Sequence, residues 1–249
     1  MKRFRSELAH SYATYSFGYC EYAERESNDA LSALYDGGFL PYTGAAKIAN
    51  TLYMARSARV RLKEFEPTSE NRRVLKKFDG YLVRTVTPLS AFERDETFLN
   101  FCLDYFGKRH GDTMPRERLQ TILDAGFITD VVTYTKDGAI MAYVLLAQDD
   151  SCSHFWFSFY DLTYIRQSLG LWLLLDCARA AQREKKTHYY IGTVYGEKGL
   201  YKTNFPALEF WDGATWNDDL QRLRTLCKSD AKREINAQDL WKDSLQDFD

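Results

Sequence analysis

Three apolar segments and the helix that follows them constrain the fold of this 249-residue chain more than any other feature. Apolar side chains make up most of each segment, and turn sequences such as Lys136-Asp137-Gly138 separate the segments. After the third segment, apolar side chains recur at helical spacing up to about Glu184. We therefore expect three consecutive strands and then a helix. The predicted strands are residues 131–135, 139–148 and 153–160, and a further strand is predicted at 187–195.

This order of elements is typical of an acyltransferase fold of the GNAT type. The third strand leads into the loop Arg166-Gln167-Ser168-Leu169-Gly170, directly before the helix. Such a loop can direct backbone N–H groups and the positive end of the helix toward a pyrophosphate or a backbone oxygen. The sequence predicts an α+β, GNAT-like fold with a mixed sheet flanked by helices, and a smaller N-terminal α/β unit packed on it.

Three domains are expected. Residues 1–85 form a basic N-terminal domain, residues 86–216 a GNAT-like catalytic domain, and residues 217–249 a charged helical tail. In the first domain, Ser27-Asn28-Asp29 can cap a helix that ends at Gly37-Gly38. Further elements are expected at residues 39–44 (a turn), 58–65 and 207–211 (strands), and 95–109 and 116–125 (helices).

A basic segment stands out in the N-terminal domain. Residues 52–85 carry nine cations and four acids, although the whole chain has a net charge of −2. Pro67 and Thr68 precede a short predicted helix whose exposed side is almost wholly cationic. Because the whole molecule does not attract nucleic acid, any such binding must come from this local patch.

The cysteines and the chain start exclude several other classes of protein. The five cysteines (20, 102, 152, 177 and 227) are scattered and lack CxxC spacing, which indicates reduced thiols, not a disulfide framework or a zinc site. Charge at the N-terminus is not followed by an apolar run, and no window has the apolar length of a membrane span. We expect a cytoplasmic protein.

Several short motifs share their order and spacing with one family. They are Gly18-Tyr19-Cys20-x-Tyr22, Gly38-Phe39, residues 65–73, Tyr105 with Arg109-His110, Phe159-Tyr160-Asp161, Ser168-Leu169-Gly170, Tyr189-Tyr190-Ile191-Gly192, and Tyr201-Lys202-x-x-Phe205. Together they resemble the aminoacyl-tRNA–protein transferases, namely the arginyl-transferases of eukaryotes and the related bacterial leucyl-transferases. These enzymes move an amino acid from tRNA to the N-terminal amine of a protein. The resemblance covers most of residues 16–211.

The chain also departs from that family. The family's cysteine cluster is absent from residues 50–57, and Leu162 replaces the proline that usually follows Asp161. Cys20 therefore stands alone, and an iron–sulfur or other metal site is not supported. The chain resembles a divergent member, so the resemblance does not identify its donor or acceptor.

The resemblance implies roles for particular residues in binding tRNA. Arg72, Arg73, Lys76 and Lys77 would contact the tRNA backbone or its acceptor end, and a solvated helix face is the alternative. Lys202 with Tyr201 would hold the terminal phosphate or the acceptor carboxylate, unless they lie in a plain surface loop.

Three residues are the candidates for the chemistry of transfer. Asp161 would hold an amine, or alternatively cap a turn. Ser168 would act with the N–H groups near Gly170 on the ester or the 3′ terminus, or serve only as an N-cap. Glu209 would be a general base if its strand faces the site. The residues expected to bind substrate are Cys20, Tyr105, Arg109, His110, Tyr160, Leu169 and Gly170.

The predicted reaction is direct aminolysis of the aminoacyl ester by the α-amine of a protein or peptide, one with an acidic first residue, with arginine or leucine transferred. Such a transfer needs no nucleophilic residue, and no histidine has motif spacing to a serine. The expected partners are aminoacyl-tRNA and the acceptor N-terminus, without cofactor, metal, membrane or DNA. Two alternatives stay open: an acyl-CoA-dependent N-acyltransferase, which has no use for the basic segment, and a non-catalytic tRNA-binding homologue.

Overall fold

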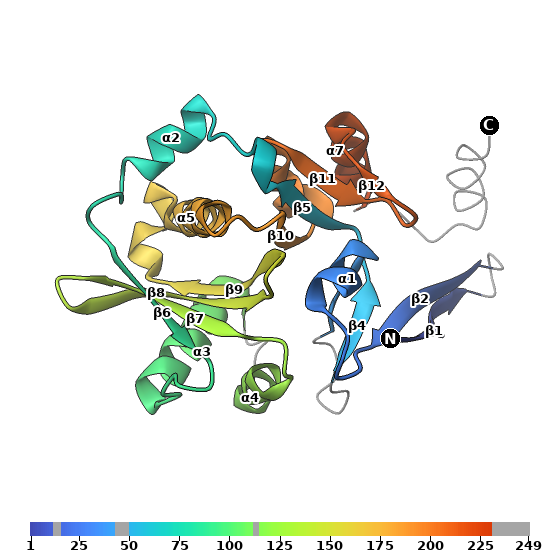
Figure 1. Ribbon diagram of the computed structural model, residues 1–249, viewed down its shortest axis with the longest axis horizontal. Coiled ribbons are helices and arrows are strands. Elements are labelled where there is room, and N and C mark those ends of the chain that lie inside the picture. The colour runs from blue at the N-terminus through green and yellow to red at the C-terminus, as the bar shows by residue number, and fades with distance from the viewer. Residues whose placement is uncertain (12–15, 43–49, 112–114, 231–249) are drawn as a thin grey trace.

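The computed structural model describes residues 1–11, 16–42, 50–111 and 115–230, which form two β-sheets with helices packed on them (Figure 1). The smaller sheet has four antiparallel strands in the order β1-β2-β4-β3. One short helix, α1, packs on it through Leu31, Leu34 and Tyr35, which are buried. The elements of this unit are β1 (Lys2–Ser11), β2 (Ser16–Glu24), α1 (Leu31–Asp36), β3 (Phe39–Pro41) and β4 (Thr51–Met54).

The larger sheet has eight strands in the order β12-β11-β5-β10-β9-β8-β7-β6. Strands β9 and β10 are parallel, and every other neighbouring pair is antiparallel, so the sheet is mixed. The strands are β5 (Ser57–Arg61), β6 (Val83–Pro88), β7 (Asp130–Lys136), β8 (Ala139–Gln148), β9 (Cys152–Tyr160), β10 (His188–Thr193), β11 (Leu208–Trp211) and β12 (Trp216–Asn217).

Helices cover both faces of the larger sheet, as Figure 1 shows. Helices α2 (Ser69–Leu75) and α5 (Leu169–Arg183) lie on one face, and α3 (Glu96–His110) and α4 (Arg116–Asp124) on the other. Helix α7 (Leu220–Ser229) packs against α6 (Gly196–Gly199) and β11. Short 3-10 helices occur at η1 (Leu62–Glu64), η2 (Leu162–Gln167) and η3 (Leu200–Asn204). Within the described part of the chain, no helix has both the length and the apolar character needed to cross a membrane.

Helix α5 carries one buried charge on its core face. The Tyr134 hydroxyl donates a hydrogen bond of 2.8 Å to Asp176, and Arg179 and Arg84 pair with the same carboxylate at 3.2 and 3.4 Å. A buried carboxylate is tolerated when it is paired and hydrogen-bonded in this way. Asp176 therefore anchors α5 to β6 and β7.

The strands and helices predicted between residues 95 and 211 are confirmed, with ends shifted by a few residues. Thr68 caps α2, and a capping box with Asn71 completes the cap. The expected cap of α1 is wrong: the helix starts at Leu31 with Ala30 at the N-cap, because Asp29 binds the backbone N–H of Glu26 instead. The expected turn at residues 39–44 is wrong at its start, because Phe39–Pro41 form strand β3. Residues 43–44 of that turn and the tail beyond residue 230 lie outside the described residues.

Residues 57–85 do not belong to the smaller sheet, where we expected them. Strand β5 lies between β10 and β11 of the larger sheet, and its Ala58 and Val60 side chains are fully buried. The strand is also shorter than predicted, because the chain turns into η1 at Leu62. The smaller unit therefore ends near residue 56 and not at residue 85.

Candidate functional site

Strands β9 and β10 form a fork in the larger sheet. They pair at only three positions, the last of which joins Tyr190 to His154. Beyond that point β9 contains a bulge, and the pairing of β10 with β5 becomes irregular around Gly192, whose φ is +79°. Because bulges bend a strand, residues 155–160 and 191–193 diverge. We call this region the fork.

Three tyrosines from distant segments gather at the fork. The rings of Tyr105 on α3 and Tyr160 at the end of β9 have centroids 5.0 Å apart. Burial raises the pKa of Tyr105 well above its usual range, Tyr160 raises it further, and the nearby Arg109 guanidinium opposes the rise. Burial also raises the pKa of Tyr201, Tyr160 raises it further, and Arg109 opposes the rise. The structure thus brings together four residues that the sequence predicted as site residues.

Gly170 makes room for one of these rings. A Cβ atom on Gly170 would lie 2.9 Å from the Tyr160 hydroxyl oxygen and 3.0 Å from the ring carbon that bears it. The glycine therefore serves close packing against Tyr160, which occupies the space over the first turn of α5. Binding of a ligand by the N–H groups near Gly170 stays a prediction.

Leu169 and Ser168, at the start of α5, differ in burial and in backbone conformation. Leu169 is fully buried and belongs to the core, so its expected contact with substrate is wrong for this conformation. Ser168 has a left-handed φ of 67°, its side chain caps nothing, and its carbonyl accepts the bond from Trp172. The Ser168 N–H donates to the carbonyl of Ile165. The N–H groups of residues 169–171 are the donors that the start of a helix leaves without an intrahelical acceptor. Binding of an ester at Ser168 stays a prediction.

Lys202 does not face solvent as a phosphate ligand would. Its ammonium donates hydrogen bonds of 2.7 Å to the carbonyls of Ile191 and of Thr193. Burial lowers its pKa to about 8. These bonds argue against the expected contact of Lys202 with a terminal phosphate or an acceptor carboxylate, which stays a prediction. Its neighbour Tyr201 is exposed.

A buried pair beside the fork was not predicted. The Tyr35 hydroxyl and the Nδ1 atom of His154 lie 3.0 Å apart and share a proton in a hydrogen bond. Burial, reinforced by the charge of Lys202, lowers the pKa of His154 to about 3, so the imidazole is neutral. The sequence did not predict this pair, because a single histidine in a strand forms no recognisable motif. The one signal of an irregular strand at this point was Gly192 inside the next strand.

Asp161 adopts the alternative role that the sequence left open. One carboxylate oxygen accepts hydrogen bonds from the backbone N–H and the hydroxyl of Thr163, at 2.9 and 2.7 Å. This is a turn cap at the start of η2. The residue follows Tyr160 directly and so stands at the fork, where its binding of an amine stays a prediction.

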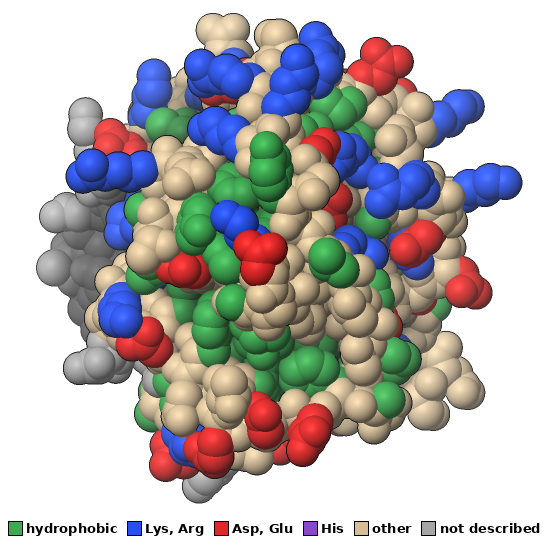
Figure 2. Space-filling view, turned by 90° about the vertical axis from the view of Figure 1, so that its left-hand side faces the viewer, with side chains coloured by type: hydrophobic (Ala, Val, Ile, Leu, Met, Phe, Trp, Pro, Cys, Tyr) green, Lys and Arg blue, Asp and Glu red, His purple; other side chains and the backbone are tan. Residues whose placement is uncertain are grey.

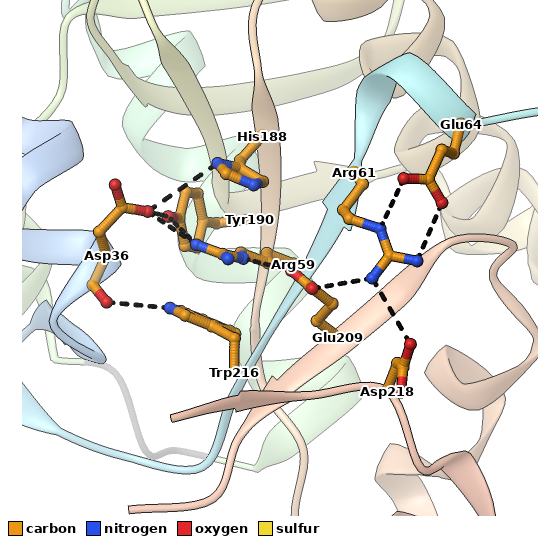
Figure 3. Close-up of polar contacts among 9 residues, drawn as sticks. All are labelled: Asp36, Arg59, Arg61, Glu64, His188, Tyr190, Glu209, Trp216 and Asp218. Atoms are coloured by element: carbon orange, nitrogen blue, oxygen red, sulfur yellow. Dashed lines mark hydrogen bonds and ion pairs between the residues drawn. The ribbon is translucent and has the colours of Figure 1, made fainter. Parts of the chain in front are cut away.

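Glu209 lies in an ion-pair network with Arg59 and Arg61 of β5 (Figure 3). Arg59 and Arg61 donate to its two carboxylate oxygens at 2.7 and 2.8 Å. Burial raises the pKa of Glu209, but the two arginines outweigh that effect and the net shift is downward. A carboxylate held in its charged form by two cations is a poor general base. The geometry therefore argues against the predicted base role.

The same network joins the two sheets. Arg59 also donates to Asp36 at the end of α1, at 2.7 Å, and its guanidinium lies over the Trp216 ring (Figure 3). The Tyr190 hydroxyl donates to the same Asp36 carboxylate. Glu209 thus belongs to the contact between the smaller unit and β5, β10 and β12.

The basic residues of α2 are exposed, as predicted. They are Arg72, Arg73, Lys76 and Lys77. Figure 2 shows Lys and Arg side chains gathered along the upper part of the face on which α2 lies, above an area where apolar side chains reach the surface. The Lys77 ammonium donates to the backbone oxygen of Gln167, which ties this patch to the loop that enters α5.

Two predicted substrate residues are not part of the gathered group. Cys20 lies on β2 of the smaller sheet as a free thiol, and burial raises its pKa, which disfavours the reactive thiolate. The side chain of His110 lies outside the described part of the structure, although the backbone ends α3 there. Their roles stay predictions.

A comparison with family models decides the classification. The acetyltransferase (GNAT) domain model matches residues 70–202, more than half of the chain. The chain belongs to the GNAT domain family. In this GNAT domain, the match begins in α2 and ends at Lys202, so it contains both the basic patch and the fork.

Similar curated proteins agree with the resemblance seen in the motifs. Proteins named aspartate/glutamate leucyltransferase match this GNAT protein with 28% identity over 176 residues in Cereibacter sphaeroides and 27% over 171 residues in Xanthomonas campestris. A protein of the same name from Jannaschia is 31% identical over 173 residues. These matches cover 64–65% of the chain and 61%, 66% and 59% of the three relatives, so the chain spans less than two thirds of their length.

Solved structures match this chain with lower sequence identity than the curated relatives do. The C-terminal domain of a putative lysylphosphatidylglycerol synthetase from Agrobacterium fabrum gives a TM-score of 0.44 at 16% identity and covers 83% of this chain and 70% of that one. FemX gives a TM-score of 0.43 at 13% identity and covers 68% and 60%.

Proposed function

We propose that this GNAT protein transfers an amino acid from aminoacyl-tRNA to the N-terminal α-amine of a protein or peptide. The similarity to proteins named aspartate/glutamate leucyltransferase favours leucine as the amino acid and an acidic residue at the acceptor N-terminus. One structural observation carries the proposal: the exposed cations of α2 adjoin the loop that enters α5 beside the fork, through the bond from Lys77 to Gln167. Phosphate bound on α2 would thus lie next to the fork.

The proposed reaction is a direct aminolysis. The neutral α-amine attacks the ester carbonyl, a C–N bond forms, and the bond to the 3′ oxygen of the tRNA breaks. That oxygen leaves as a hydroxyl group after it takes the proton released by the amine. Positioning of the two reactants supplies up to roughly 7–11 kcal/mol of the barrier reduction in reactions of this kind. The protein therefore needs a rigid site more than it needs a nucleophile.

Arg109 is the residue that we assign to the acidic acceptor side chain. It is exposed at the end of α3, and it lies near Tyr105 and Tyr201, where its charge opposes the burial-driven rise in their pKa values. A guanidinium can bind a carboxylate through two parallel hydrogen bonds, which favours Asp and Glu over neutral residues. The tyrosine rings beside it suit an apolar aminoacyl group.

The exposed cations of α2 weigh against the acyl-CoA alternative, because a CoA-dependent reaction does not need this basic surface. The loss of the family's cysteine cluster from residues 50–57 keeps the non-catalytic alternative open.

The test is transfer of radiolabelled leucine from leucyl-tRNA to peptides that begin with Asp, Glu or Ala. The proposal predicts label on the first two peptides only. Label delivered from an acyl-CoA instead, with no binding of tRNA, would refute it.

A second experiment tests the basic patch. The Arg72→Ala/Arg73→Ala variant should bind tRNA more weakly, and the slope of log K against log salt should fall by about 1.8, at about 0.9 per lost phosphate contact. The matched control is Arg183→Ala/Lys228→Ala, which removes the same charge from exposed positions elsewhere. Equal slopes in the two variants would contradict a role for α2.

A further inference from the structure

At the fork, backbone carbonyl groups of β10 lack hydrogen-bond donors from the neighbouring strands. Its pairing with β9 ends at Tyr190, and its register with β5 resumes only at Thr193. The carbonyl groups in the interval lie next to a buried strand end, since Ile191 is 2% exposed. Buried carbonyl groups need a donor, and a neighbouring strand cannot supply one where the strands diverge.

Lys202 supplies the missing donors. Its ammonium reaches back from η3 and binds the carbonyls of Ile191 and Thr193, at 2.7 Å each. Gly192 between them has a left-handed φ, which turns both carbonyls toward the same side. A Cβ atom on Gly192 would lie 3.6 Å from the lysine nitrogen and 3.9 Å from Nε2 of His154, so lysine and histidine enclose this residue.

The ammonium is held there without a carboxylate. In the described residues its hydrogen-bond partners are the two carbonyl oxygens, and the Tyr201 ring lies at 6.0 Å. His154 faces the same position as a neutral imidazole bonded to Tyr35. A buried charge without an opposite charge is unfavourable for stability.

We propose that Lys202 is a positioning residue that holds the carboxyl end of β10 away from β9 and thereby keeps the fork open for the aminoacyl ester. The role in transfer rests on the proposed function, whereas the hold on β10 does not. Lys202 acts through the backbone of β10 and does not touch the reacting atoms.

Lys202→Met tests the proposal because methionine keeps most of the side-chain length and removes the donor. We expect kcat for transfer to fall at least 30-fold, while KM for aminoacyl-tRNA changes less than threefold because α2 is untouched. The control is Lys198→Met, which removes the same charge from an exposed position four residues earlier. Lys202→Arg, which keeps the charge and the donors, should recover at least tenfold of the lost kcat. Wild-type kcat in folded Lys202→Met would overturn the proposal.

Hydrogen exchange provides a readout that does not depend on activity. Peptides that cover residues 188–195 should exchange at least tenfold faster in Lys202→Met than in Lys198→Met, with peptides from β7 and β8 unchanged. If the wild type transfers no amino acid but this difference is seen, the proposed function fails and the hold on β10 stands. Equal exchange in the two variants would overturn the inference itself.

Discussion

Replacement of Gly38 by alanine tests how tightly the two sheets are joined. Gly38 follows α1 in a left-handed conformation with φ +80°, and a Cβ atom on it would overlap the indole ring of Trp211 on β11. Trp211 is 8% exposed and packs against Trp216, so the ring has little space to move. The new methyl group would therefore act on the contact between the smaller sheet and the larger one.

The expected loss has two parts. A left-handed conformation costs an L-residue about 1–2 kcal/mol relative to glycine, and the insertion of a methyl group into a packed contact costs about 1–3 kcal/mol. Gly38→Ala should therefore lower the free energy of unfolding by about 2–5 kcal/mol. Gly80 is a matched control, because its φ is +82° and nothing lies within 4 Å of a Cβ there. Gly80→Ala should lose only the first part.

Urea unfolding, followed by tryptophan fluorescence and by far-UV circular dichroism, measures both values. The difference between the variants should be about 2 kcal/mol, which corresponds to roughly 4–8 °C in Tm for a chain of this size. In a Trp211→Ala background, the excess cost of Gly38→Ala should disappear, because the colliding ring is gone. Equal losses in Gly38→Ala and Gly80→Ala, in the presence of Trp211, would refute the reasoning.

Three further predictions concern the fork. Because burial lowers the pKa of Lys202 to about 8 from an unfolded value of 10.5, the unfolded chain binds more protons between these values. The free energy of unfolding should therefore rise between pH 8 and pH 10.5 by up to about 3 kcal/mol more in wild type than in Lys202→Met. Urea unfolding at each pH measures both proteins, and an equal rise in the two would exclude this effect. Arg109→Ala should raise KM for Asp and Glu peptides in the transfer assay about tenfold, or about 1.4 kcal/mol. The control Lys108→Ala loses only an exposed ion pair with Asp104 and should leave KM unchanged. An equal rise of KM in both variants would count against the assignment of Arg109. Gly170→Ala should lower the free energy of unfolding by about 1–2 kcal/mol, because the new methyl group meets Tyr160. In a Tyr160→Ala background, Gly170→Ala should leave the free energy of unfolding unchanged. An equal loss with and without the Tyr160 ring would disprove the contact.

Local patterns in the sequence predicted the local structure well. The three strands from residue 130 to 160 and the helix after them appear where alternation and helical spacing placed them. The short helix after Pro67 and Thr68 also appears where it was predicted, and its cap depends on neighbours three residues apart. The tyrosines and Arg109 could be gathered into one site only through the resemblance, because they come from three separate segments.

Long-range pairing could not be read in the same way. The place of β5 between β10 and β11 depends on partners about 130–150 residues away. The bond between Tyr35 and His154 spans 119 residues. Lysine is most often exposed, so its residue type gave no reason to expect the ammonium of Lys202 inside the fork. Glu209 was misjudged for a similar reason, since its two arginine partners lie on β5.

The position of β5 also bears on how the protein is made. Its residues leave the ribosome early, but both neighbouring strands are encoded after residue 187. At the usual 5–20 residues per second, β5 waits roughly 6–25 s for a partner. During that time β5, whose Ala58 and Val60 side chains are buried in the folded protein, has two open edges, which favour aggregation and binding by chaperones. An N-terminal fragment that ends at residue 85 would remain in that state permanently, so the protein is best produced as one unbroken chain.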